Sequence, residues 1–277
     1  MNIYRTKKLD KKVKKINEMA VSEFLIEGKR KALLIDTGLG IFNIKKYVEK
    51  LTKKDLMVVN SHFHPDHSNG NHLFKDVYIG EKDMPFTKDE NVYFKLVDDI
   101  TTGVYERFPA AKFFLKPIVK KIFMTKKGKT KYRPLKDGEV IDLGKKELIV
   151  KELPGHTPGS ITFLDPDEKL IYACDACNMA TWLFTNPDCK LSDYANNLEQ
   201  YYKYVKKNGY KKMYGSHVPF ANRISFIKDY AKFIHNINEK SALVKFNIPG
   251  VNSPLCVAVK PSIKHFVFAC LYFEKQI

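Results

Sequence analysis

The chain has 277 residues, of which 44% are hydrophobic and 13% aromatic. This composition excludes intrinsic disorder, collagen-like repeats and small disulfide scaffolds, and it suffices for a substantial core. Five cysteines in this length make no disulfide framework, and no apolar stretch approaches the roughly 18 residues of a membrane span. Because no linker or repeat divides the chain, we expect one domain over residues 1–277, located in the cytoplasm and without a membrane partner.

The charge balance of 48 basic against 31 acidic residues gives a net charge of +17. Such a surplus suggests a polyanionic partner, but only five of the basic residues are arginine, the side chain that best recognises phosphate and bases. The basic runs also lack interleaved aromatic residues. The expected partner is therefore a small-molecule substrate rather than a nucleic acid, with a homodimer as a further option.

The first half of the chain alternates strand and helix patterns. Glu18–Glu27 and Lys31–Asp36 are typical of two strands of a hairpin, and Phe42–Leu51 has helical spacing. Leu56–Asn60 is a short apolar run that predicts a buried strand. This strand delivers Ser61 and the residues after it to a loop at the strand end.

The segment 82–127 differs from the rest because it is rich in aromatic side chains at helix-like intervals and has no clear strand pattern. We interpret it as a helical, cap-like insertion within the domain. A lid over the substrate, a part of the core and a dimer contact remain alternatives for it.

The second half also mixes strands with helices, which predicts an α/β fold class. Ser192 is the expected N-cap of the first helix. Strands are predicted at Glu139–Leu143, Glu147–Leu153, Ile161–Leu164, Leu170–Cys174, Leu255–Val259 and Phe266–Phe273, and helices at Ser192–Lys207 and Arg223–Asn238.

Four potential metal ligands follow the buried strand within six residues: His62, His64, Asp66 and His67. In extended backbone, His62 and His64 point to the same side and can share one ion. Asp66 and His67, which follow a proline, can hold a second. Burying three imidazoles and a carboxylate without a cation would leave several polar groups unsatisfied, so the pattern indicates a metal site.

Three further strand ends carry residues of the same kind. His156 lies in a loop bracketed by glycines, Asp175 ends an apolar strand, and His217 follows another strand. A carboxylate at the end of a buried strand is costly unless it is paired or coordinating. Together with the first motif, these loops resemble a metal site built on a sheet scaffold.

The order of these motifs resembles that of the metallo-β-lactamase-fold hydrolases. In chain order they are Asp36–Gly38, the HxHxDH motif, the PGHTPGS loop, Asp175 and His217. This resemblance implies an αββα sandwich with two metal ions at one edge. It also implies that Asp36 supports the ligand loop without binding metal. By the same resemblance, His62, His64 and His156 hold one ion, Asp66, His67 and His217 hold the other, and Asp175 bridges them.

The ligand set is that of the glyoxalase II and lactonase-like branch of these hydrolases. Antibiotic-hydrolysing members lack a bridging aspartate at the position of Asp175, so that activity is not expected. The lactonases carry a tyrosine three residues after this aspartate, where the present chain has Asn178. Phosphodiesterases and nucleases of the same fold share all seven ligands.

The predicted function is a dinuclear metal-dependent hydrolase that uses a metal-bridging hydroxide to cleave a small ester, thioester or lactone, with Asp66 relaying a proton. Zinc fits the nitrogen and oxygen ligands best, and iron or manganese are the other options. A phosphodiesterase or nuclease is one alternative. A non-hydrolytic redox or metal-binding protein is another, for which Cys174 and Cys177 beside Asp175 would be the candidate groups.

Overall fold

The computed structural model describes residues 4–18, 21–40, 42–87, 129–183, 186, 188–218, 220–238, 243–246, 255–263 and 265–271. The chain divides into two compact units. The first comprises the described residues up to Leu135 together with Asp142–Lys146, and the second comprises Lys136–Ile141 and the described residues from Glu147 onward. The single domain stays a prediction, and residues 88–127 of the predicted insertion lie outside the described residues.

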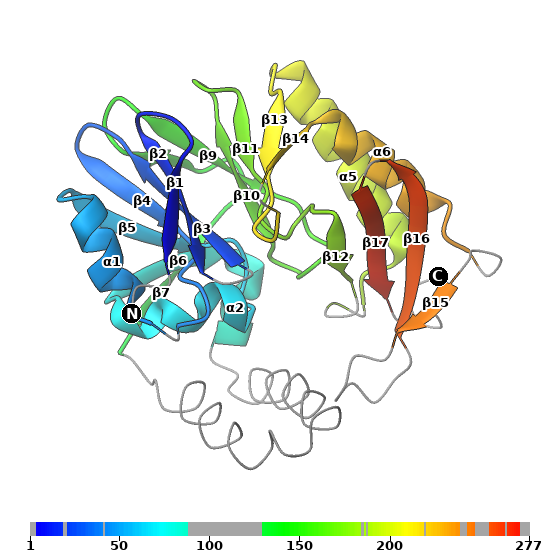
Figure 1. Cartoon of the computed structure of the whole chain (residues 1–277), viewed down its shortest axis with the longest axis horizontal. Coiled ribbons are helices and arrows are strands. Elements are labelled where there is room, and N and C mark those ends of the chain that lie inside the picture. Colours follow the sequence, from blue (N-terminus) through cyan, green and yellow to red (C-terminus); the bar gives the residue numbers. More distant parts are fainter. Residues whose placement is uncertain are drawn as a thin grey trace, which may run out of the picture. The chain divides into compact units, whose positions relative to one another are not determined.

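The first unit contains a seven-stranded sheet in the order β1-β2-β3-β4-β5-β6-β7 (Figure 1). Strands β1 to β4 pair antiparallel, and β4 to β7 pair parallel. The carboxyl ends of β4, β5 and β6 therefore meet at one edge of the sheet, where sites of α/β proteins form. The strands are β1 (Arg5–Lys8), β2 (Val13–Glu18), β3 (Val21–Glu27), β4 (Lys31–Ile35), β5 (Asp55–Asn60), β6 (Asp76–Gly80) and β7 (Lys131–Leu135).

The predicted hairpin, helix and buried strand of this unit are confirmed. Strands β3 and β4 form the hairpin, with Glu27 opposite Ala32. Helix α1 (Ile44–Leu51) begins after Asn43, whose side-chain oxygen accepts the Lys46 N–H at 2.9 Å. That bond satisfies one of the free N–H groups at the helix start.

The core of the first unit is formed by the inward side chains of the strands and of α1, among them Leu25, Leu34, Ile44, Val48 and Val58. At the edge of the sheet, all four residues of β1 are exposed, and three of them are basic. Short helices follow the inner strands: α2 (Pro65–Ser68) and the 3₁₀ helix η1 (Asn69–Leu73) after β5, and the 3₁₀ helix η2 (Glu81–Thr87) after β6.

The second unit contains a six-stranded sheet in the order β14-β13-β11-β10-β9-β8 and a four-stranded sheet in the order β12-β17-β16-β15. Because β10 is antiparallel to both β9 and β11, and β11 is parallel to β13, the strands β9, β11 and β13 run in one direction. Their bounds are β8 (Val140–Asp142), β9 (Glu147–Glu152), β10 (Ile161–Asp165), β11 (Leu170–Tyr172), β12 (Ala180–Trp182), β13 (Lys212–Tyr214), β14 (Ala221–Arg223), β15 (Leu243–Phe246), β16 (Leu255–Ile263) and β17 (His265–Leu271).

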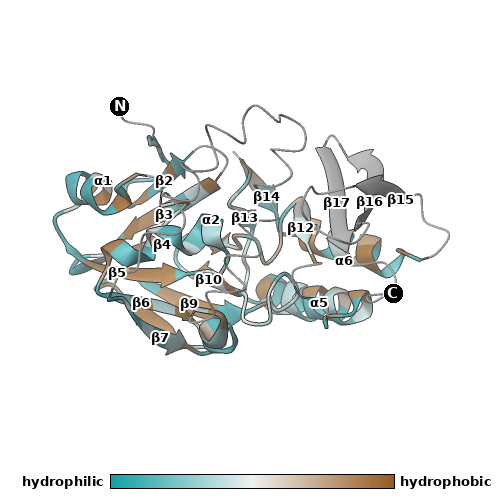
Figure 2. Cartoon of the chain, turned by 90° about the horizontal axis from the view of Figure 1, so that it is seen from below, coloured by the Kyte–Doolittle hydropathy of each residue, from teal (hydrophilic) through white to brown (hydrophobic). Residues whose placement is uncertain are grey.

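Two amphipathic helices, α5 (Leu191–Lys207) and α6 (Ser225–His235), bury one face in the core of this unit. In Figure 2 the ribbon of α5 alternates between hydrophobic and hydrophilic colour along its length. The expected N-cap at Ser192 is wrong, because the helix begins one residue earlier and Lys190 is the capping residue. Burial of Leu191 in the core outweighs the capping preference of serine. None of the described helices is long and apolar enough to cross a membrane.

Candidate metal centre

The loop after β5 gathers the three histidines of the HxHxDH motif in the first unit. The ring centroid of His62 lies 4.6 Å from that of His64 and 4.3 Å from that of His67. All three histidines are buried, whereas 35% of the Asp66 side chain is exposed. Three buried imidazoles at such spacing are a costly arrangement unless they share a ligand.

Asp36, which follows β4, holds this loop through contacts with Ser61 and His67. Its Oδ2 atom lies 2.9 Å from Nδ1 of His67, and its Oδ1 atom accepts the Ser61 N–H at 2.7 Å. The Ser61 hydroxyl donates to Oδ2 at 2.9 Å and lies 3.0 Å from Nδ1 of His62. Since the hydroxyl proton goes to Asp36, the hydroxyl oxygen accepts from His62, and the Nε2 atoms of both histidines are left to bind metal.

Several neighbours to which the sequence assigned no role fix the same loop. The Thr37 N–H donates to the His67 carbonyl at 2.8 Å, and the Asn60 side chain donates to it at 3.1 Å. Asp83, fully buried after β6, accepts the Phe63 N–H at 3.2 Å. These residues lie at the shared carboxyl edge of β4, β5 and β6, and that position was the signal that could have found them.

Two more carboxylates, Glu18 and Glu23, lie fully buried behind this support. A Cβ added to Gly38 would lie 2.1 Å from an oxygen of Glu18 and 2.5 Å from one of Glu23. Burial raises the pKa of Glu23 well above its usual value, and the negative charges of Glu18 and Asp36 raise it further. The charge of His67 lowers this pKa, but its effect is the smallest of the contributions.

The raised pKa of Glu23 predicts a specific dependence of stability on pH. The folded protein binds this proton more tightly than the unfolded chain does, so stability is lost as pH rises from the ordinary glutamate pKa to that of folded Glu23. For one proton the slope is about 1.4 kcal/mol per pH unit within that window. Urea unfolding of the metal-free protein across pH should show this loss in the wild type, and Glu23→Gln should remove it.

The matched control is Glu168→Gln, which makes the same substitution at an exposed turn. Glu168→Gln should leave the pH profile of the wild type unchanged. A profile of Glu23→Gln that coincides with the wild type would show that Glu23 is ionised in the folded protein.

In the second unit, each of three strands that run in one direction is followed by one of the remaining ligands. His156 follows β9, Asp175 follows β11, and His217 follows β13. The Asp175 Oδ2 atom lies 3.0 Å from Nε2 of His217 and 3.9 Å from Nε2 of His156. Nδ1 of His156 lies 2.7 Å from the Trp182 carbonyl, so it carries the proton and Nε2 is left for a metal.

Cys174 and Cys177, which flank Asp175, are both buried and form no disulfide. Burial raises the pKa of the Cys177 thiol far above its usual value. A buried thiol of this kind is inert, because the thiolate is the reactive form. The burial of both thiols therefore gives no support to redox chemistry at these cysteines.

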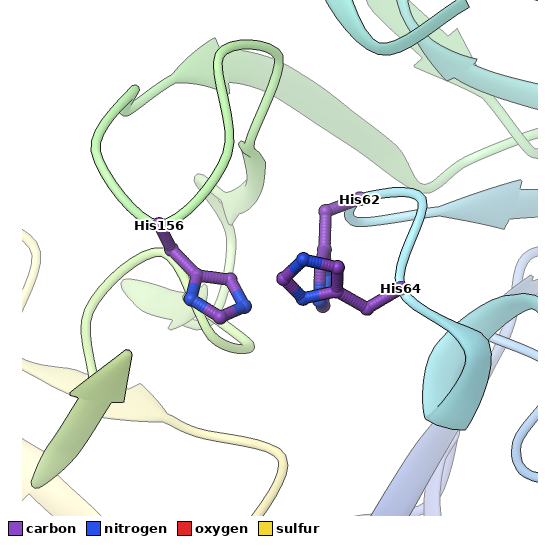
Figure 3. Close-up of side chains that lie close together, drawn as sticks. All are labelled: His62, His64 and His156. Carbon is purple, nitrogen blue, oxygen red and sulfur yellow. The ribbon is translucent and has the colours of Figure 1, made fainter. Parts of the chain in front are cut away.

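Two groups of His and Asp side chains could each hold a metal ion, since the ligand atoms within each group lie within 4.8 Å of one another. Figure 3 shows the imidazole rings of the first group turned toward one another. All donors in these groups are nitrogen or carboxylate oxygen, a ligand set that suits zinc, iron and manganese. The first group is His62, His64 and His156, and the second is Asp66, His67, Asp175 and His217.

Three histidines lie outside these groups: His72, His235 and His265. Nδ1 of His72 lies 2.8 Å from the Asn69 carbonyl, and Nε2 of His235 lies 3.4 Å from a carboxylate oxygen of Glu199. His235 is exposed on α6, which makes it a useful control in mutagenesis.

A family model described as the metallo-beta-lactamase superfamily matches residues 17–217. A Homo sapiens protein named acyl-coenzyme A thioesterase MBLAC2 is 27% identical over 214 residues, which cover 70% of this chain and 71% of that protein.

Solved structures resemble the chain in fold. A metallo-beta-lactamase from Pontibacter korlensis, 15% identical, matches with a TM-score of 0.55 over 84% of this chain and 100% of that one. A metallo-beta-lactamase family protein from Thermus thermophilus, 22% identical, matches with a TM-score of 0.52 over 76% of this chain and 72% of that one. The predicted fold class is confirmed.

Proposed function

Since the chain belongs to the metallo-beta-lactamase superfamily, we propose that this hydrolase is an acyl thioesterase with a dinuclear metal centre. The observation that carries the proposal is the pair of His and Asp groups, which together contain all seven predicted ligands. The relative named an acyl-coenzyme A thioesterase favours a thioester over a simple ester. Asn178, in the place of the lactonase tyrosine, speaks against a lactone.

The two ligand groups differ in their exposure to solvent. The histidines of the first group are buried and would hold one ion, which we propose to be zinc. In the second group Asp66 and His217 are partly exposed, by 35% and 31% of their side chains. We therefore expect the substrate to approach the second ion, on the side of these two residues.

Asp175 is suited to bridge the two ions, because its Oδ2 atom lies within 4 Å of a ligand from each group. Divalent ions in such a site lower the pKa of water toward about 7 and polarise the scissile carbonyl. Asp66 can accept the proton that is released and return it to the leaving thiolate, and its partial exposure allows exchange with solvent. Asp36 and Ser61 keep His62 and His67 in the tautomer that binds metal.

The proposed substrate is a small molecule, an acyl group linked through a thioester to coenzyme A. The phosphates of that carrier are anionic, and the net charge of +17 favours their approach in solution. Lysine serves this long-range attraction as well as arginine does. The attraction depends on net charge, whereas the planar guanidinium of arginine matters for direct contacts to phosphate.

The test is metal analysis followed by a substrate panel. We expect two ions per chain, and we expect chelation to abolish hydrolysis and zinc, iron or manganese to restore it. An acyl-coenzyme A thioester should be cleaved with a higher kcat/KM than the N-acetylcysteamine thioester of the same acyl group, which lacks the phosphates. The oxygen ester of that acyl group should be cleaved more slowly still.

Two results would contradict the proposal. Bis-nitrophenyl phosphate as the best substrate would establish the phosphodiesterase alternative. A single ion per chain, with Asp66 and His217 replaceable without loss of metal, would exclude the dinuclear centre.

A further inference from the structure

We propose that Tyr194 is a positioning residue of the metal centre, which fixes His156 and Asp175 relative to each other. Tyr194 lies in the first turn of α5, far along the chain from either ligand, and its side chain is fully buried. The inference rests on the proposed metal centre, because it concerns how two of its ligands are held.

The ring of Tyr194 packs against the loop that carries His156. A Cβ added to Gly155 would lie only 2.1 Å from Cδ2 of this ring and 2.6 Å from Cε2. The edge of the ring therefore occupies the space where any other residue would have a side chain. Glycine is required there because no Cβ fits between the backbone and the ring.

The hydroxyl of Tyr194 reaches the loop that carries Asp175. It donates to the Ala176 carbonyl at 2.8 Å, and Ala176 directly follows the aspartate. One rigid side chain with two rotatable torsions thus contacts the residue before His156 and the residue after Asp175. The tyrosine side chain therefore spans the two ligand loops.

Two asparagines hold the His156 loop in the same place. Asn197, one turn further along α5, donates to the Pro154 carbonyl at 3.1 Å, and Asn186 donates to the Gly155 carbonyl at 3.2 Å. Tyr194 and Asn197 are three residues apart, so they lie on one face of the helix. Because α5 is anchored in the core by Leu198 and Val205, this face is a firm base for both ligand loops.

The spacing of the two ligands matters for metal binding. Nε2 of His156 lies 3.9 Å from Oδ2 of Asp175, and both atoms must reach the same ion. Functional constellations tolerate displacements of only about 0.5 Å. A loop that loses its support should therefore bind metal less tightly even when the fold survives.

The experiment compares Tyr194→Phe with Tyr201→Phe. Tyr201 lies two turns further along the same helix, is also buried, and its hydroxyl lies 2.7 Å from the Thr162 hydroxyl. Each variant removes one buried hydroxyl from α5, but only the first removes a contact to a ligand loop. Zinc affinity is measured by competition with a chelator, and the stability of the metal-free protein by urea unfolding.

We expect both variants to unfold at lower urea concentration than the wild type. Zinc affinity should fall about 10- to 100-fold in Tyr194→Phe, as for other outer supports of metal ligands, and should stay within about twofold in Tyr201→Phe. Asn197→Ala, which keeps the tyrosine, should give a smaller loss of zinc affinity and little loss of stability.

Equal zinc affinity in Tyr194→Phe and Tyr201→Phe would overturn the positioning role and leave the proposed function intact. A wild-type protein that binds no zinc, iron or manganese would overturn the proposed function and, with it, this inference. The two failures are thus distinguished by the wild-type measurement alone.

Discussion

Replacing Asp175 by alanine should abolish hydrolysis and leave the protein folded. Its carboxylate is the group whose Oδ2 atom lies near both His156 and His217, so its removal separates the two halves of the proposed centre. The loss in kcat/KM should exceed the about 10- to 100-fold that changes in outer supports cost. Metal content should fall toward one ion per chain, as measured by elemental analysis after gel filtration.

Two further variants test whether this loss is specific to the carboxylate of Asp175. Asp175→Asn keeps the shape of the side chain but replaces one of its carboxylate oxygens with an amide nitrogen, and it should be nearly as inactive. His235→Ala removes an exposed imidazole that belongs to neither ligand group and should retain full activity. Full metal content and activity in Asp175→Ala would show that this carboxylate is not a ligand.

Replacing Gly40 by alanine should destabilise the protein by about 2 to 5 kcal/mol, from two separate costs. Gly40 has a φ of +65°, which costs an alanine about 1 to 2 kcal/mol. An added Cβ would also lie 2.6 Å from the backbone of Asn69, and backbone atoms cannot move aside cheaply. The resulting shift would separate the loop that carries Asp36 from the segment that carries His67, so metal affinity should fall as well.

Gly209→Ala is the matched control, because Gly209 has a φ of +77° but nothing lies within 4 Å of an added Cβ. It should cost only the conformational part, about 1 to 2 kcal/mol, and leave metal affinity unchanged. Urea unfolding and chelator competition measure both quantities. A loss of stability in Gly40→Ala no larger than that in Gly209→Ala would show that the loop can yield without harm.

The sequence predicted those parts of the fold in which one pattern dominates. The apolar run before His62 predicted a buried strand, and the structure has strand β5 there. Strands β1 and β2 were missed because their lysines look like a solvated charge run in the sequence, although Lys15 of β2 is buried. No alternation marks β2 as a strand, since the buried Val13 and Ile16 are three residues apart and lie on opposite faces.

Candidate ligands could be named from the sequence because histidine and aspartate are metal-binding residue types, and several of them follow predicted strands. Apart from Asp36, which the family resemblance implied, the residues that support these ligands could not be named. Tyr194 is one aromatic residue in an amphipathic helix, and nothing local distinguishes it from Tyr201. Asp83 lies after a strand that was not predicted, so its place beside Phe63 depends on β5 and β6 being neighbours. Such contacts arise only from tertiary structure.

Strand β1 places a row of positive charge along one edge of the sheet in the first unit. In the described part of the chain β1 pairs with β2 alone, and an edge strand of this kind can add a strand from another molecule. Arg5, Lys7 and Lys8 would then face like charges on a second copy, and this repulsion opposes aggregation through the sheet edge. Salt weakens the protection, since the Debye length falls to about 3 Å at 1 M. Low ionic strength is therefore the safer condition for storing the concentrated protein.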